Sequence, residues 1–171
     1  MEMTLQNSTW HSKQEVKIAD YGENLIQKEI EPYGYVFYKP VSDSAHLIDG
    51  LALQGKEFKF GIEVKTKPKF KKYPATGFDY RHYCDYIKFT EQQELPLFVF
   101  FVDEELGKIY GNFLHVLDEP REYCGMKYPG TFWKNGRKIR YYPMSAMVLI
   151  RDLTESEISN LKSLRSNCGE K

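Results

Sequence analysis

The stretch Leu47–Lys67, LIDGLALQGKEFKFGIEVKTK, decides the fold of this chain. It predicts two strands joined by a short polar turn at residues 54–56. In the second strand apolar and other residues alternate, in the order Phe58, Lys59, Phe60, Gly61, Ile62, Glu63, Val64 and Lys65. Because successive strand side chains point to opposite faces, Glu63 and Lys65 are expected to share one face and the apolar residues the other.

Asp49, in the first of these strands, has mostly apolar neighbours: Leu47, Ile48, Leu51, Ala52 and Leu53. A buried carboxylate is costly unless it is paired or bound to a cation. Two acids and a lysine on adjoining strand ends would meet that cost by holding a divalent metal through oxygen ligands.

This arrangement resembles a known signature. Asp49, thirteen intervening residues and then Glu63-Val64-Lys65 are similar to the motif of the PD-(D/E)xK nuclease superfamily, which includes type II restriction enzymes and archaeal Holliday-junction resolvases. Ile48 stands where that motif has proline. The expected order of helix, strand, Asp-bearing strand, Glu-x-Lys strand and helix also matches, over roughly residues 18–102.

The resemblance implies an α/β fold with a mixed central β-sheet flanked by helices, and a Mg²⁺-dependent (or Mn²⁺-dependent) nuclease that hydrolyses DNA phosphodiester bonds. It implies that Asp49 and Glu63, with the Val64 carbonyl, coordinate the metal, which polarises the scissile phosphate and lowers the pKa of a water. Lys65 would orient that water or stabilise the developing charge. Glu23 would complete the site by binding a water of the metal or a second ion.

The helix acid has a competitor. A helix is expected from a Ser12 cap to about Glu31, before Pro32. At helical spacing, an apolar arc is formed by Ile18, Ala19, Leu25, Ile26 and Ile30. Glu23 falls inside this arc and Glu29 near it, and either one could instead reach water or pair with a lysine.

Nucleic-acid contacts are expected just after the Glu-x-Lys strand. Four lysines follow in a proline-broken loop, Lys67, Lys69, Lys71 and Lys72, and they would contact phosphates, unless the loop is only solvated. A turn at residues 76–79, with Asp79 as cap, precedes a helix over 80–94. The resemblance places the first turns of this helix, with Arg81 and Tyr83, beside the site, although helical tyrosines are also common in cores.

The rest of the chain predicts a central buried strand over 96–102, a strand over 108–117, a late strand over 146–150 and a final helix with a capping box at Thr154 and Glu157. Residues 119–140 predict irregular structure or a small hairpin turning at 134–137. They form either a substrate-facing flap or a packed accessory edge. The expected organisation is one domain over 1–171, with a core over 12–118, an accessory region over 119–145 and a C-terminal strand and helix over 146–168.

Composition leaves the partner open, because 24 basic and 24 acidic residues give no net charge. No apolar run approaches the ~20 residues of a membrane span, no signal peptide is evident, and three scattered cysteines suggest reduced thiols. We therefore expect a cytoplasmic protein without a membrane as partner, whereas the resemblance implies DNA as partner and allows a homodimer. The alternatives are a non-catalytic nucleic-acid- or protein-binding module on the same fold, or a protein in which Asp49, Glu63 and Lys65 form only a buried ion network.

Overall fold

The computed structural model describes residues 14–40 and 46–166. The expected cap Ser12 lies outside these ranges. Among the helices of the described residues, none has the length and apolar character needed to cross a membrane.

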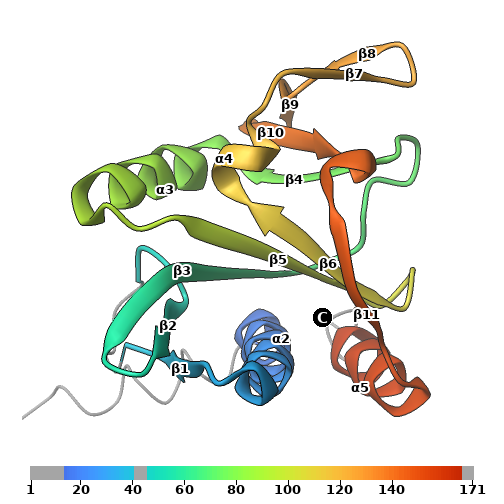
Figure 1. Ribbon diagram of the computed structural model, residues 1–171. Helices are drawn as coiled ribbons and strands as arrows, with labels where there is room; N and C mark the ends of the chain where they lie inside the picture. The colour runs from blue at the N-terminus through green and yellow to red at the C-terminus, as the bar shows by residue number, and fades with distance from the viewer. Residues whose placement is uncertain (1–13, 41–45, 167–171) are drawn as a thin grey trace, which may run out of the picture.

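A six-stranded mixed sheet forms the centre of the molecule (Figure 1). In spatial order its strands are β1 (Val36–Tyr38), β2 (Gly50–Gln54), β3 (Glu57–Thr66), β5 (Leu97–Asp103), β6 (Lys108–Phe113) and β11 (Val148–Asp152). Only β3 and β5 pair in parallel, and the other neighbours are antiparallel. The predicted α/β class with a mixed sheet is thereby confirmed.

Two layers cover this sheet. One layer holds the helices α2 (Gln14–Ile30) and α5 (Glu155–Ser166), which Figure 1 shows below the sheet. The layer above it holds α3 (Tyr80–Gln93), α4 (Leu114–Leu117) and a second sheet of β4 (Ala75–Asp79), β10 (Arg137–Pro143) and β9 (Gly130–Lys134). The remaining elements are short: a β7 (Arg121–Tyr123) and β8 (Met126–Tyr128) hairpin, and the 3₁₀ turns η1 (Glu31–Tyr33) and η2 (Met144–Ala146).

The apolar run over 96–102 forms the central strand β5, as predicted, and its side chains divide between the two layers. Phe100 and Val102 pack with α2 and α5 around Ile26, whereas Val99 and Phe101 pack with α3 and β10 around Tyr142. A strand covered on both faces requires apolar residues at every position, which explains the unbroken run.

The structure corrects two local predictions, in each case because a distant segment decides the outcome. Residues 76–79 form a buried strand rather than a turn, because they pair with β10. A Cβ on Gly77 would lie 2.1 Å from the Arg140 carbonyl oxygen, so this glycine permits close backbone approach. The predicted strand over 108–117 ends at Phe113 and continues as α4, where the Asn112 side chain accepts from the Phe113 N–H and donates to the Ala146 carbonyl. Of the two alternatives for residues 119–140, the structure shows the hairpin: β9 and β10 form it, β7 and β8 form a second one, and β10 also joins β4.

The two predicted helix caps that fall within the described residues are confirmed. Asp79 accepts a hydrogen bond from the Arg81 backbone N–H at 2.9 Å and caps α3. At α5, the Glu157 N–H donates to the Thr154 hydroxyl and the Thr154 N–H to the Glu157 carboxylate, which is the reciprocal pattern of a capping box. The hairpin turn predicted at 134–137 is also confirmed, with positive φ at Asn135 and Gly136.

Candidate active site

Asp49 lies where β2 and β3 begin to diverge. Its backbone N–H donates to the Ile62 carbonyl at 3.1 Å, and its Oδ2 accepts from the Val64 N–H at 2.7 Å. The carboxylate therefore accepts the hydrogen bond that a backbone carbonyl of β2 would accept if the pairing of β2 and β3 continued. Since the N–H and C=O of one strand residue face the same edge, the Val64 carbonyl faces the Asp49 side.

Glu63 is buried on β3, on the face opposite the α2 and α5 layer. Its Oε1 accepts two hydrogen bonds, from Lys65 Nζ at 2.5 Å and from the Tyr86 hydroxyl at 2.6 Å. Burial and then the Glu63 charge raise the pKa of Tyr86, so the phenol remains a donor. Glu63 Oε2 and Asp49 Oδ1 accept no hydrogen bond from the described residues, which leaves one oxygen of each carboxylate for a ligand.

The electrostatics of Asp49 and Glu63 indicate a deficit of positive charge around these two carboxylates. Burial, followed by the negative charge of Glu63, raises the pKa of Asp49 to about 8, and the bond from the Val64 N–H and the charge of Lys65 oppose this only in part. A divalent cation between the carboxylates would reverse the shift.

The donors fit a small hard cation. Within 14–40 and 46–166, no three His, Cys, Asp or Glu side chains gather as a metal cage. Mg²⁺, however, is commonly held by one or two carboxylates and keeps several waters. Asp49 Oδ1, Glu63 Oε2 and the Val64 carbonyl form a donor set of this kind.

The two candidate helix acids point to different places. Glu23 pairs with Lys39 at 3.1 Å, and its pKa is raised first by burial and further by the charge of Glu63. Its own charge in turn raises the pKa of Asp49. Glu29 instead pairs with Arg151 at 2.7 Å, which also binds Glu157. The structure thus brings Glu23, and not Glu29, toward Asp49 and Glu63.

A close helix–strand contact fixes the position of Glu23. A Cβ on the preceding residue, Gly22, would lie 1.8 Å from Thr66 Oγ1 at the end of β3. Only glycine lets α2 approach the strand this closely, and the charge of the next residue, Glu23, then acts on Asp49.

The lysine loop divides into inward-facing and exposed members. Lys67 is half-buried and donates to the Gly77 carbonyl, and burial, followed by the charges of Lys65 and Lys134, lowers its pKa to about 8. The backbone N–H of Lys69 donates to Asp103 Oδ2 at 2.8 Å, and its ammonium donates to the Phe70 carbonyl. Lys71 and Lys72 are exposed. Two of the four lysines that were predicted to contact phosphates therefore donate hydrogen bonds to carbonyl oxygens of the protein itself.

Arg81 and Tyr83, on the first turns of α3, lie apart from the carboxylates. Arg81 is exposed and bonds both Asp79 oxygens, at 3.2 and 2.9 Å. The ring of Tyr83 lies 4.1 Å from the guanidinium of Arg140, which pairs with Asp118 at 2.6 Å. The α3 residue that contacts the site is Tyr86. Sequence reasoning missed this contact, because a helical tyrosine on the apolar face is typical of a core.

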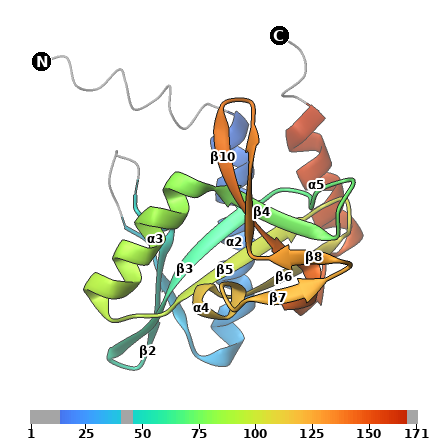
Figure 2. The same cartoon turned by 90° about the horizontal axis from the view of Figure 1, so that it is seen from above.

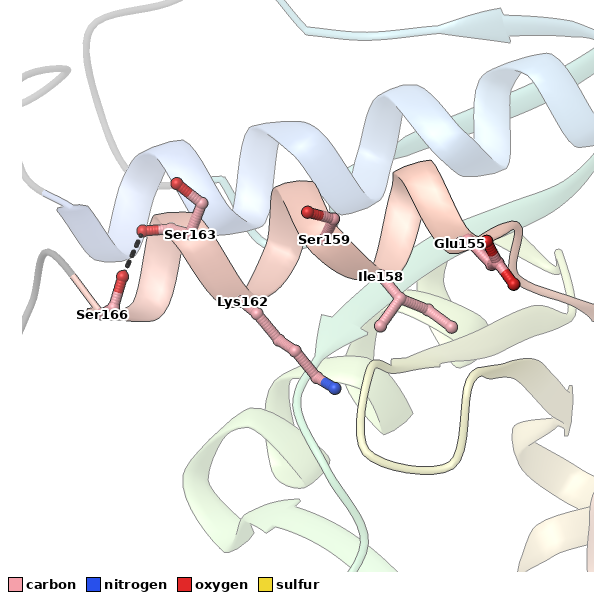
Figure 3. A pocket seen from close by; sticks show the side chains of 6 residues that line it. All are labelled: Glu155, Ile158, Ser159, Lys162, Ser163 and Ser166. Atoms are coloured by element: carbon pink, nitrogen blue, oxygen red, sulfur yellow. Dashed lines mark hydrogen bonds between the residues drawn. The ribbon is translucent and has the colours of Figure 1, made fainter.

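A separate groove runs along α5. It measures about 580 Å³ and is lined by Glu155, Ile158, Ser159, Lys162, Ser163 and Ser166 (Figure 3). It shares no residue with the Asp49 and Glu63 site.

No protein-family model matches the chain, and no curated protein matches its sequence. Among solved structures it is similar to a Holliday junction resolvase from the archaeal hyperthermophile Archaeoglobus fulgidus. The match has a TM-score of 0.50 and 12% sequence identity, and covers 74% of this chain and 89% of that one. The chain has the fold of this resolvase. The resemblance to Holliday-junction resolvases that the sequence indicated is therefore confirmed at the level of the fold.

Proposed function

We propose that this protein is a Mg²⁺-dependent nuclease that hydrolyses DNA phosphodiester bonds. The observation that carries the proposal is the edge where β2 and β3 diverge. There Asp49 and Glu63 each keep one oxygen free of hydrogen bonds from the described residues, the Val64 carbonyl faces the same side, and Lys65 stands beside them. The resolvase fold supports it.

Asp49, Glu63 and the Val64 carbonyl would hold Mg²⁺ or Mn²⁺, and Glu23 would bind a water of the metal or a second ion. When bound, the metal supplies positive charge to the scissile phosphate and lowers the pKa of a water.

The chain's own residues supply orientation and charge. Tyr86 and Lys65 hold one oxygen of Glu63 and so direct the other toward the ligand. The Val64 N–H fixes Asp49 in the same way. The Lys65 ammonium orients the attacking water or stabilises the negative charge that develops on the phosphate.

The test is a survey of purified protein on plasmid, linear and branched DNA, with Mg²⁺, Mn²⁺ or EDTA, beside Glu63→Gln. Glu104→Gln is the matched control, because Glu104 is equally buried and ion-paired, to Arg165, but lies outside the site. We expect metal-dependent cleavage that falls more than about 100-fold in Glu63→Gln and is kept in Glu104→Gln. Full cleavage by pure Glu63→Gln would overturn the mechanism.

One observation favours a second function. The Glu63 carboxylate is already neutralised by Lys65 at 2.5 Å, so the site can persist as an internal ion pair without metal. A binding module on this fold would use the lysines and not the carboxylates. DNA binding that is insensitive to EDTA, with no cleavage of any DNA form, would identify it.

A further inference from the structure

Positive charge is strongly segregated in this chain of zero net charge. Two segments, residues 64–78 and 123–151, contain no acidic residue. Together they hold eleven of the 24 basic residues: Lys65, Lys67, Lys69, Lys71, Lys72, Lys127, Lys134, Arg137, Lys138, Arg140 and Arg151. The rest of the chain therefore carries 13 basic and 24 acidic residues.

The fold brings these two segments together. The strand β4, at the end of the first segment, pairs with β10 of the second from Ala75↔Pro143 to Asp79↔Ile139. The rings of Phe70 and Phe132 also touch, with centroids 5.6 Å apart. The β9–β10 hairpin (Gly130–Pro143) thus lies directly against the lysine loop, and Figure 2 shows it projecting beside the start of α3.

The hairpin also contacts the first turn of α3, and its charge acts on the lysine loop. On one face Lys138 lies 4.3 Å from the ring of Tyr80, in the first turn of α3. Burial, followed by the charges of Lys65 and of Lys134 at the hairpin tip, lowers the pKa of Lys67, so the tip lies within electrostatic reach of the lysine loop.

The tip of the hairpin exposes an aromatic ring and two cationic side chains. Trp133 is 73% exposed. Lys134 and Arg137 flank the Asn135-Gly136 turn, are exposed, and make no ion pair or side-chain hydrogen bond with the described residues. The strand register places Trp133 on one face of the hairpin tip and Lys134 with Arg137 on the other. Exposed cations and an exposed indole at one hairpin tip are the combination that binds nucleic-acid strands, with cations on phosphates and the ring stacked on a base.

We propose that the β9–β10 hairpin is a DNA-binding arm specific for unpaired bases, with Trp133 stacking on an exposed base while Lys134 and Arg137 bind the flanking phosphates. The proposal shares with the proposed function only the choice of DNA as partner. It implies tighter binding to DNA with a single-stranded gap than to a continuous duplex, because paired bases do not offer a free face to the indole.

The experiment measures binding in EDTA, without metal, by fluorescence anisotropy, using a labelled duplex and the same duplex with a central gap of unpaired bases. We expect Trp133→Ala to weaken binding to the gapped DNA about tenfold and to the duplex less than about twofold. Lys134→Ala/Arg137→Ala should weaken both and reduce the slope of log K against log salt by about 2.

The controls match the variants in chemistry and differ in place. Tyr33→Ala removes an aromatic side chain that is 69% exposed on η1, and Lys56→Ala/Lys162→Ala removes two exposed cations outside the acid-free segments. Neither control should change binding to the two DNAs. In a Trp10→Phe background, where Trp133 is the one remaining tryptophan of the chain, its fluorescence should be quenched more by gapped DNA than by duplex.

Equal losses on both DNAs in Trp133→Ala, absence of quenching, or losses in the controls as large as in the hairpin variants would overturn the proposal. So would the absence of DNA binding in EDTA. The nuclease function is judged separately. Gap-selective binding without cleavage would support the arm and reject the nuclease, whereas cleavage with binding unchanged in the hairpin variants would do the reverse.

Discussion

At the scale of single residues, Asp49 shows the free-energy cost of burying a charged carboxylate, which the proposed metal would offset. Its raised pKa, about 8, means that the folded protein holds a proton there between about pH 4 and pH 8, whereas the unfolded chain does not. Unfolding releases this proton, so in EDTA the free energy of unfolding should fall as pH rises through that window, by up to about 1.4 kcal/mol per pH unit from this group.

Urea unfolding at a series of pH values checks this prediction. Asp49→Asn keeps an oxygen for the Val64 N–H and does not ionise, so its profile should be flatter than that of the wild type. Identical slopes for the two proteins would contradict the assignment.

Tyr86 is a positioning residue for Glu63. Tyr86→Phe removes the 2.6 Å hydrogen bond and keeps the buried ring, so we expect a folded protein whose cleavage rate falls about tenfold. Tyr110→Phe is the matched control, since Tyr110 is buried and its hydroxyl donates to the buried Asp103 at 3.2 Å, outside the site. Single-turnover cleavage rates compare the two, and equal rates would show that Tyr86 is only a core residue.

The candidate site was predictable to the extent that it follows from strand alternation. Glu63 and Lys65 share a face because of their spacing, and Asp49 joins them because its strand is the next one in the hairpin. Tyr86 and the inward orientation of Lys67 were not predictable, because both depend on how α3 and β4 pack on β3.

At the scale of elements, the contact between α2 and β3 controls the site. Gly22→Ala places a methyl group 1.8 Å from Thr66 Oγ1, so the helix must move and carry Glu23 with it. We expect a loss of about 1–3 kcal/mol of stability together with slower cleavage.

Thr66→Ala removes the obstructing hydroxyl, which has no hydrogen-bond partner among the described residues. The double variant Gly22→Ala/Thr66→Ala should therefore recover part of both losses, as measured by urea unfolding and cleavage in a double-mutant cycle. Strictly additive effects would show that this contact does not position the helix.

Elements with local signals were predictable, and those that depend on a distant partner were not. The Asp79 and Thr154 caps and the turn at Asn135-Gly136 form from neighbouring residues. The glycine at position 77 predicts a turn when read locally, and its role in close strand pairing appears only once β10 lies beside it.

At the scale of the whole molecule, zero net charge conceals an uneven distribution of charge along the chain. Composition gave no indication of a partner, because acids elsewhere balance the segments 64–78 and 123–151. Pairing of β4 with β10 joins these basic segments next to the Asp49 and Glu63 edge. The same pairing places β10, in the region 119–145 whose role the sequence left open, against the strand that follows the lysine loop.

The central claim, that Asp49 and Glu63 together support metal-dependent hydrolysis, is tested most directly by single-turnover cleavage of one labelled DNA. Wild type, Asp49→Asn, Glu63→Gln and Glu104→Gln would be compared at equal concentration with Mg²⁺ and with EDTA. The account predicts cleavage by the wild type and Glu104→Gln in Mg²⁺ alone, and rates lower by more than about 100-fold in the other two. Wild-type cleavage in EDTA, or undiminished cleavage by either site variant, would contradict it.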